Sequence, residues 1–142
     1  MVKKIKAVSA ILVKKNSPRK FLLLRYQIHS QTHWDFVKGK IEKNEKLLST
    51  LKREILEETG IKNFEVYPDF KKTMKYSYEE TSGKKVEKQV TYFLVFVGGK
   101  QKIKIGSEHS ESNWFSFKGA LNKLEFDNQK EILNLTNSIL KW

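Results

Sequence analysis

With 142 residues, 39% of them hydrophobic, the chain is long enough to bury one core, so we expect a single domain over residues 1–142. The absence of cysteine excludes disulfides and thiolate metal sites and favours the cytoplasm. The formal net charge of +12 suits a polyanionic ligand, but the lysines are spread without a basic block, so we favour a small molecule over RNA.

The N-terminal part of the chain predicts three strands. Residues 5–14 are apolar and β-branched enough for a buried strand, and residues 21–26 predict its neighbour. Residues 33–36 predict a short strand, in which Trp34 and Phe36 are expected to pack in the core. The N-terminal apolar run is too short and too rich in lysine to be a signal peptide or a membrane span, so we expect a soluble protein, and a monomer.

An amphipathic helix is predicted up to Thr59, followed by Gly60 as a left-handed cap. Its inward side is expected to comprise Leu48, Leu51, Lys52, Ile55 and Thr59, with Leu47 and Leu56 flanking it.

Three glutamates, Glu54, Glu57 and Glu58, lie on an adjoining side of this helix at spacing i, i+3 and i+4, so their carboxylates converge. Like charges so placed raise one another's pKa and cost stability unless a cation comes between them. A solvated acidic helix end is the simpler interpretation. A divalent cation with oxygen ligands, Mg²⁺ or else Mn²⁺, is the functional one.

After the helix, residues 64–67 alternate like a strand that Pro68-Asp69 ends. Residues 72–78 and 86–97 predict a hairpin with Gly83 at its turn. In the second strand of that hairpin Lys88, Val90 and Tyr92 share one face, because side chains alternate along a strand. A lysine and a tyrosine so placed could hold a phosphate chain and stack a base, although strands often carry such residues without a function.

The C-terminal part predicts a loop containing Glu108-His109, an edge strand over residues 111–117, and helices over 117–124 and 128–141. Asp127 or Asn128 is expected to cap the last helix. Strands interleaved with helices in this way predict an α/β sandwich, with a mixed sheet between helices.

One motif gives the acidic cluster a context. Its fixed positions are Gly39, Glu45, Arg53, Glu54, Glu57, Glu58 and Gly60, with Ile55 and Ile61 as aliphatic positions. They match G-x5-E-x7-R-E-U-x-E-E-x-G-U, where U is aliphatic, and the chain resembles the Nudix hydrolases. Without a side chain, Gly39 lets its backbone approach a phosphate or offer a carbonyl to a metal. Glu45 and Arg53 are expected to pair and to orient the glutamates.

The resemblance implies the Nudix fold and metal-assisted hydrolysis of a phosphoanhydride. It assigns Glu54, Glu57 and Glu58 to magnesium, with Glu54 also the best candidate to accept a proton from the attacking water. Lys38 and Lys40, on either side of Gly39, are candidate phosphate contacts, with solvated lysines as the alternative.

Three further segments, KKVEKQVTYFLV, residues 106–117 and residues 124–133, resemble the asymmetric bis(5'-nucleosyl)-tetraphosphatases. That resemblance implies that Lys88 contacts the phosphate chain, that Tyr92 stacks an adenine, and that Glu108 reaches the metals. His109 is expected to contact substrate. The second ring around the adenine would come from Phe126 or Trp142.

The expected reaction is hydrolysis of diadenosine tetraphosphate to ATP and AMP. Nucleoside triphosphates, dihydroneopterin triphosphate and the 5' triphosphate end of RNA are the alternatives, because the motif contacts phosphate and metal and not the leaving group. A non-catalytic nucleotide- or RNA-binding module would instead have a damaged motif, and this motif is intact.

Overall fold

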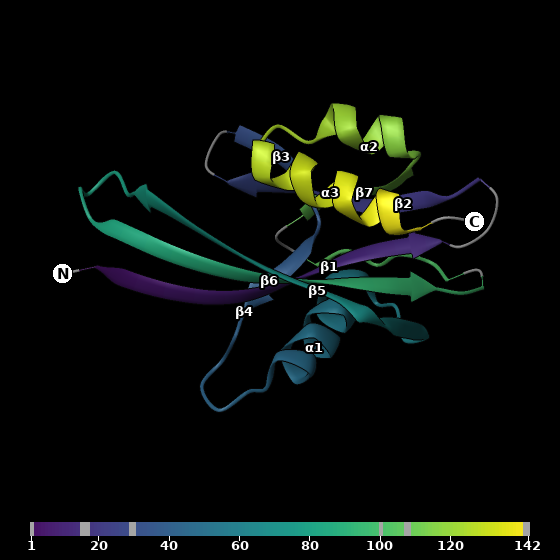
Figure 1. The fold of residues 1–142 in the computed structure, drawn as a ribbon, viewed down its shortest axis with the longest axis horizontal. Helices are drawn as coiled ribbons and strands as arrows, with labels where there is room; N and C mark the ends of the chain where they lie inside the picture. Colours follow the sequence, from purple (N-terminus) through teal and green to yellow (C-terminus); the bar gives the residue numbers. More distant parts are fainter. Residues whose placement is uncertain (1, 15–17, 29–30, 100, 107–108, 141–142) are drawn as a thin grey trace.

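The computed structural model describes residues 2–14, 18–28, 31–99, 101–106 and 109–140. Within these ranges, seven strands and three helices follow one another (Figure 1). In order they are β1 (Lys3–Lys14), β2 (Lys20–Ile28), β3 (Gln31–Asp35), β4 (Val37–Lys40), α1 (Leu47–Thr59), β5 (Phe64–Glu79), β6 (Lys85–Val97), β7 (His109–Phe115), α2 (Phe117–Lys123) and α3 (Asp127–Ile139).

All seven strands form one mixed sheet, whose main path runs β3-β2-β1-β6-β5. β1 and β6 are parallel over their whole length, whereas the other pairs are antiparallel. β1 pairs with β2 through Val13 and Lys14, and β4 takes the same edge of β1 from Ala7 to Ala10. Figure 1 shows α1 on one side of the sheet and α2 with α3 on the other, which confirms the predicted sandwich.

A separate apolar core lies on each face of the sheet because side chains alternate along β1 and β6. Ala7, Ile11 and Val13 belong to the core beneath α2 and α3, together with Val90 and Leu94. Val8, Ala10 and Leu12 belong to the core beneath α1. The face that carries Lys88, Val90 and Tyr92 is therefore the α3 side, opposite the helix that carries the glutamates.

Helix α1 confirms the predicted element but buries a different set of side chains. Leu51, Ile55 and Thr59 are buried as expected, whereas Leu48 is 48% exposed and Lys52 is also exposed. Leu47 packs against the core in the first turn instead. The buried side is therefore rotated toward Glu54, which is only 8% exposed.

Three boundary predictions were wrong. β7 runs over His109–Phe115 and not over residues 111–117. β5 does not end at Pro68 but continues to Glu79, with a register shift between Val66 and Lys71. Proline has no backbone N–H to donate to the neighbouring strand, so a strand accommodates proline at an irregularity of this kind. Helix α3 has Phe126 at its N-cap, and the Phe126 N–H donates to Oε1 of Gln129 at 3.1 Å.

The turn residues adopt the predicted conformations. Gly60, with φ of 73°, ends α1, and its N–H donates to the carbonyl oxygen of Leu56 at 2.9 Å. Gly83, with φ of 86°, lies in the turn of the β5-β6 hairpin. Within the described ranges, no helix has both the length and the apolar character that a membrane span requires.

Candidate active site

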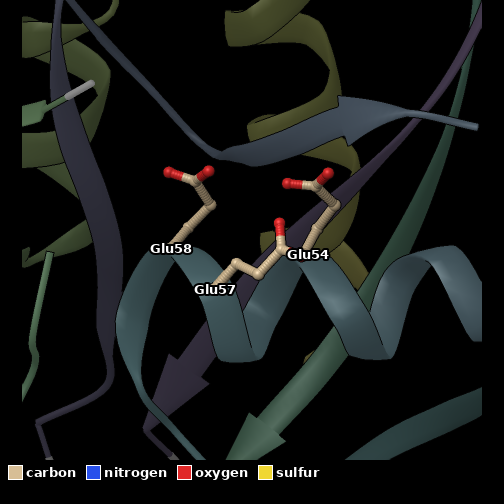
Figure 2. A group of neighbouring side chains, drawn as sticks. All are labelled: Glu54, Glu57 and Glu58. Atoms are coloured by element: carbon tan, nitrogen blue, oxygen red, sulfur yellow. The ribbon is translucent and has the colours of Figure 1, made fainter. Parts of the chain in front are cut away.

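The last two turns of α1 bring three carboxylates together. Oxygen atoms of Glu54, Glu57 and Glu58 lie within 4.8 Å of one another. Figure 2 shows the three side chains rising from one side of the helix, as the spacing predicted. Glu54 and Glu58 are largely buried, with side chains 11% and 13% exposed, whereas Glu57 is 55% exposed. Clustered carboxylate oxygens are the donors that Mg²⁺ prefers, so this site fits such an ion.

Gly39 makes room for Glu54. A Cβ atom at this position would overlap the carboxylate of Glu54, so only glycine lets that side chain lie against the β4 backbone. The requirement is close approach and not unusual torsion, because Gly39 is not among the positive-φ glycines. The Glu54 side chain is thus the group that lies against this glycine, and the approach of the Gly39 backbone to a phosphate or a metal stays a prediction.

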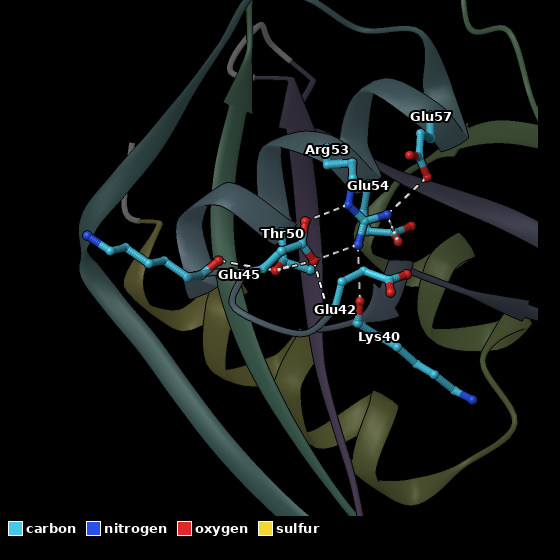
Figure 3. Close-up of polar contacts among 8 residues, drawn as sticks. Lys40, Glu42, Glu45, Thr50, Arg53, Glu54 and Glu57 are labelled. Atoms are coloured by element: carbon cyan, nitrogen blue, oxygen red, sulfur yellow. Dashed lines mark hydrogen bonds and ion pairs between the residues drawn. The ribbon is translucent and has the colours of Figure 1, made fainter.

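Arg53 ties the loop before α1 to the acidic cluster (Figure 3). Its Nε and Nη2 donate to the two carboxylate oxygens of Glu45 at 2.8 and 2.9 Å, the expected pair in bidentate form. Its Nη1 donates to Glu54 at 2.9 Å and to Glu57 at 3.2 Å. These hydrogen bonds to carboxylates, chiefly the one to Glu45, raise the pKa of Arg53. The guanidinium thus offsets part of the like-charge repulsion within the cluster.

Thr50 is a member of this network that sequence reasoning missed. Its hydroxyl donates to Oε1 of Glu45 at 3.1 Å, and the Glu42 N–H donates to the same oxygen at 2.8 Å. Glu45 is thus held from the helix, from the loop and by Arg53. Nothing in the sequence indicated this role for Thr50, because only the folded loop brings Glu45 to its hydroxyl.

The Glu45 network predicts a pH dependence. Hydrogen bonds from Arg53 and then from the Glu42 N–H lower the pKa of Glu45 from 4.5 to about 2. A folded-state pKa below the unfolded one means that Glu45 stabilises the fold above pH 4.5 and that this contribution is lost as the pH falls toward 2. In acid titrations of the free energy of unfolding, Glu45→Gln should therefore show a shallower decline than wild type. Glu65→Gln, at an exposed position, should decline like wild type.

A cavity of about 850 Å³ opens over the glutamates and is lined also by Gly39, Arg53, Lys38, Lys40 and Lys88. Lys38 and Lys88 also line a second cavity of about 550 Å³, so the two cavities adjoin.

The two lysines shared by the cavities have opposite pKa shifts. Nζ of Lys38 lies 2.7 Å from Oδ2 of Asp35 and 5.0 Å from the ring centroid of Tyr26. Burial lowers the pKa of Lys38, but the charge and hydrogen bond of Asp35 outweigh it and the pKa is raised. Burial, followed by the charge of Lys38, lowers the pKa of Lys88.

The second cavity is aromatic. It is lined by Tyr92 together with Tyr76, Tyr78 and Phe126, and by Asn128 from α3. Tyr92 is only 4% exposed and packs edge-on to Phe36 at 6.4 Å, whereas Phe126 is 50% exposed. Burial raises the pKa of the Tyr92 hydroxyl. Of the two rings proposed from the sequence, Phe126 shares a cavity with Tyr92. Trp142 lies outside the described residues.

Two predictions concern the segment before β7: that Glu108 reaches the metals and that His109 contacts substrate. Glu108 lies outside the described residues. His109 begins β7, and its side chain is 0% exposed, with Nδ1 2.8 Å from Oε2 of Glu58. His109 thus contacts a member of the acidic cluster, and its contact with substrate stays a prediction. Tyr76 and Tyr78 were also missed. The pairing of β5 with β6 sets them opposite Lys88 and Val86, and both line the cavity that Tyr92 lines.

Comparison with known proteins agrees with this geometry. A family model of the NUDIX domain matches residues 3–135. The chain belongs to the Nudix family. Membership places it among hydrolases that act on acid anhydrides of phosphorus. No curated protein matches the chain.

Solved structures show the same fold. A C. elegans Ap4A hydrolase in a binary complex has a TM-score of 0.84 at 24% identity, covering 96% of this chain and 97% of its own. MutT protein from Methanosarcina mazei has a TM-score of 0.67 at 27% identity, covering 95% and 96%. The E. coli dihydroneopterin triphosphate pyrophosphohydrolase has a TM-score of 0.75 at 15% identity, covering 95% and 97%.

Proposed function

We propose that this Nudix protein hydrolyses a phosphoanhydride bond of a dinucleoside polyphosphate, with diadenosine tetraphosphate, cut to ATP and AMP, as the leading substrate. The observation that carries the proposal is the pair of adjoining cavities. One contains the clustered carboxylates, the other is aromatic, and Lys38 and Lys88 line both. A substrate that has both a polyphosphate chain and a base matches that arrangement.

The acidic cavity would hold the reacting phosphates. Glu54, Glu57 and Glu58 would hold magnesium, which when bound supplies neutralisation of phosphate charge and a more acidic water. Lys38, Lys40 and Lys88 would contact the remaining phosphate oxygens. Glu54 would accept the proton of the attacking water, since its carboxylate is buried and held by Arg53 at 2.9 Å.

The aromatic cavity would hold a base. Tyr92 forms part of its wall, and the half-exposed Phe126 offers a ring face for stacking. The likeness to the C. elegans Ap4A hydrolase supports an adenine dinucleotide. The E. coli dihydroneopterin triphosphate pyrophosphohydrolase has the same fold, so triphosphates remain the second candidate class. The intact motif favours an enzyme over a non-catalytic nucleotide- or RNA-binding module.

The decisive experiment is product analysis in ¹⁸O-labelled water. The protein is incubated with Mg²⁺ or Mn²⁺ and a panel of dinucleoside polyphosphates, nucleoside triphosphates and 5'-triphosphorylated RNA. We expect the highest kcat/KM for diadenosine tetraphosphate, with ATP and AMP as products, and the label identifies the phosphorus attacked. A preference for triphosphates would overturn the substrate, and no hydrolysis of any compound would overturn the activity.

Removing the exposed ring of the base cavity should weaken substrate binding. Stacking of one base on an aromatic side chain contributes about 1–3 kcal/mol, so Phe126→Ala should raise KM for diadenosine tetraphosphate about 5- to 150-fold. The effect on kcat should be small because the acidic cavity is untouched. Leu135→Ala, which removes a 38% exposed apolar side chain from the same helix, should leave KM unchanged. Equal KM values for the two variants would remove Phe126 from the base site.

A further inference from the structure

A buried histidine contacts the acidic cluster from a different part of the chain. Nδ1 of His109, at the start of β7, lies 2.8 Å from Oε2 of Glu58, in the last turn of α1. The two side chains are 0% and 13% exposed. At 2.8 Å the imidazole and the carboxylate are in direct contact, at the distance of an ion pair but without the angle of a regular hydrogen bond. The contact is therefore made away from bulk water, where a polar interaction is strong.

The histidine ring is itself held in place. The ring of Tyr26 meets it edge-on, with centroids 4.2 Å apart and planes at 74°. The Tyr26 hydroxyl donates to the carbonyl oxygen of Phe36 at 3.0 Å, so that ring is anchored to the chain just before β4. The backbone N–H of His109 donates to the Gly106 carbonyl oxygen at 3.3 Å. The imidazole thus has one orientation, fixed from β2 and from its own loop.

The three glutamates are therefore oriented by two different groups. Arg53 contacts Glu54 and Glu57, at 2.9 and 3.2 Å, and His109 contacts Glu58. A carboxylate held in contact with a fixed neighbour has side-chain torsions that are already restricted. Such partners of metal-binding carboxylates contribute about 10- to 100-fold to metal affinity.

We propose that His109 is a positioning residue for metal binding, which fixes the Glu58 carboxylate and does not touch the substrate. This inference rests on the proposed function, because it requires the acidic cluster to bind a divalent ion. It rests on the 2.8 Å contact and on the burial of both side chains, and not on a change in protonation.

The test is Mn²⁺ and Mg²⁺ binding by calorimetry on metal-free protein. His109→Leu removes the donor and should raise the metal Kd about 10- to 100-fold. His109→Asn keeps an amide donor near the position of Nδ1 and should stay close to wild type. His33→Leu is the control, because His33 also contacts a glutamate, Glu125 at 3.0 Å, at a more exposed place outside the cluster, and its metal Kd should equal that of wild type.

Kinetics separate positioning from substrate contact. At saturating metal, His109→Leu should recover the wild-type KM for substrate. A raised KM with an unchanged metal Kd would assign His109 to the substrate and overturn the proposal, as would equal metal Kd values for the Leu, Asn and wild-type proteins. If the Leu variant does not fold, His109→Gln replaces it, because its amide lies one bond further out and should bind metal worse than the Asn variant. Wild type that binds no metal would instead overturn the proposed function.

Discussion

Glu54→Gln is expected to lower kcat by about 10²- to 10⁴-fold at saturating Mg²⁺, the range that a general base contributes. Glutamine has the same shape as glutamate, so the variant should fold. It cannot accept a proton from water, and it offers a cation a neutral oxygen in place of a carboxylate. Steady-state hydrolysis of diadenosine tetraphosphate, with circular dichroism to confirm the fold, measures the effect.

Varying the metal concentration separates the two roles of Glu54, as a metal ligand and as the base that accepts the proton. If loss of a metal ligand were the whole effect, raising Mg²⁺ until binding saturates would restore kcat. We expect a large deficit to persist, because the proton acceptor is missing at every metal concentration. Glu65→Gln makes the same change of charge at an exposed site on β5 and should keep the wild-type kcat. A Glu54→Gln enzyme with kcat near that of wild type would remove Glu54 as the base.

Gly39→Ala is expected to cost nearly as much activity as Glu54→Gln while changing thermal stability little. The added methyl group would overlap the carboxylate of Glu54, and that carboxylate is the end of a flexible side chain. The side chain should therefore move aside, and the backbone of β4 should stay in place. Displacing the base and metal ligand from its position should lower both kcat and metal affinity. The measurements are kcat, the metal Kd and the thermal midpoint.

The double variant tests whether Gly39 acts through Glu54. If it does, Gly39→Ala should have little further effect in a Glu54→Gln background, because the two changes remove one interaction. Additive losses would show a separate role for Gly39, such as backbone contact with phosphate. Gly98→Ala is the control, since a Cβ atom there would meet nothing within 4 Å, and its activity and stability should match wild type.

The sequence by itself determined the parts of the site that depend on local geometry. Glu54, Glu57 and Glu58 converge because a helix places residues three and four apart on one side. Lys88 and Tyr92 share a face because strand side chains alternate. The Arg53–Glu45 pair followed from opposite charges separated by nearly two turns of helix. Each of these depends on residues close together in the chain.

Tertiary structure decided what distant segments bring to the site. His109 reaches Glu58 only because β7 pairs with β2 at Tyr26, and Phe126 joins Tyr92 only because α3 packs across the β6 face. Leu48 stays exposed because the sheet is covered by the side of α1 that carries Leu51 and Ile55. Periodicity gives the side of an element on which a residue lies. Which other element covers that side depends on the packing of the whole chain, and no local pattern encodes it.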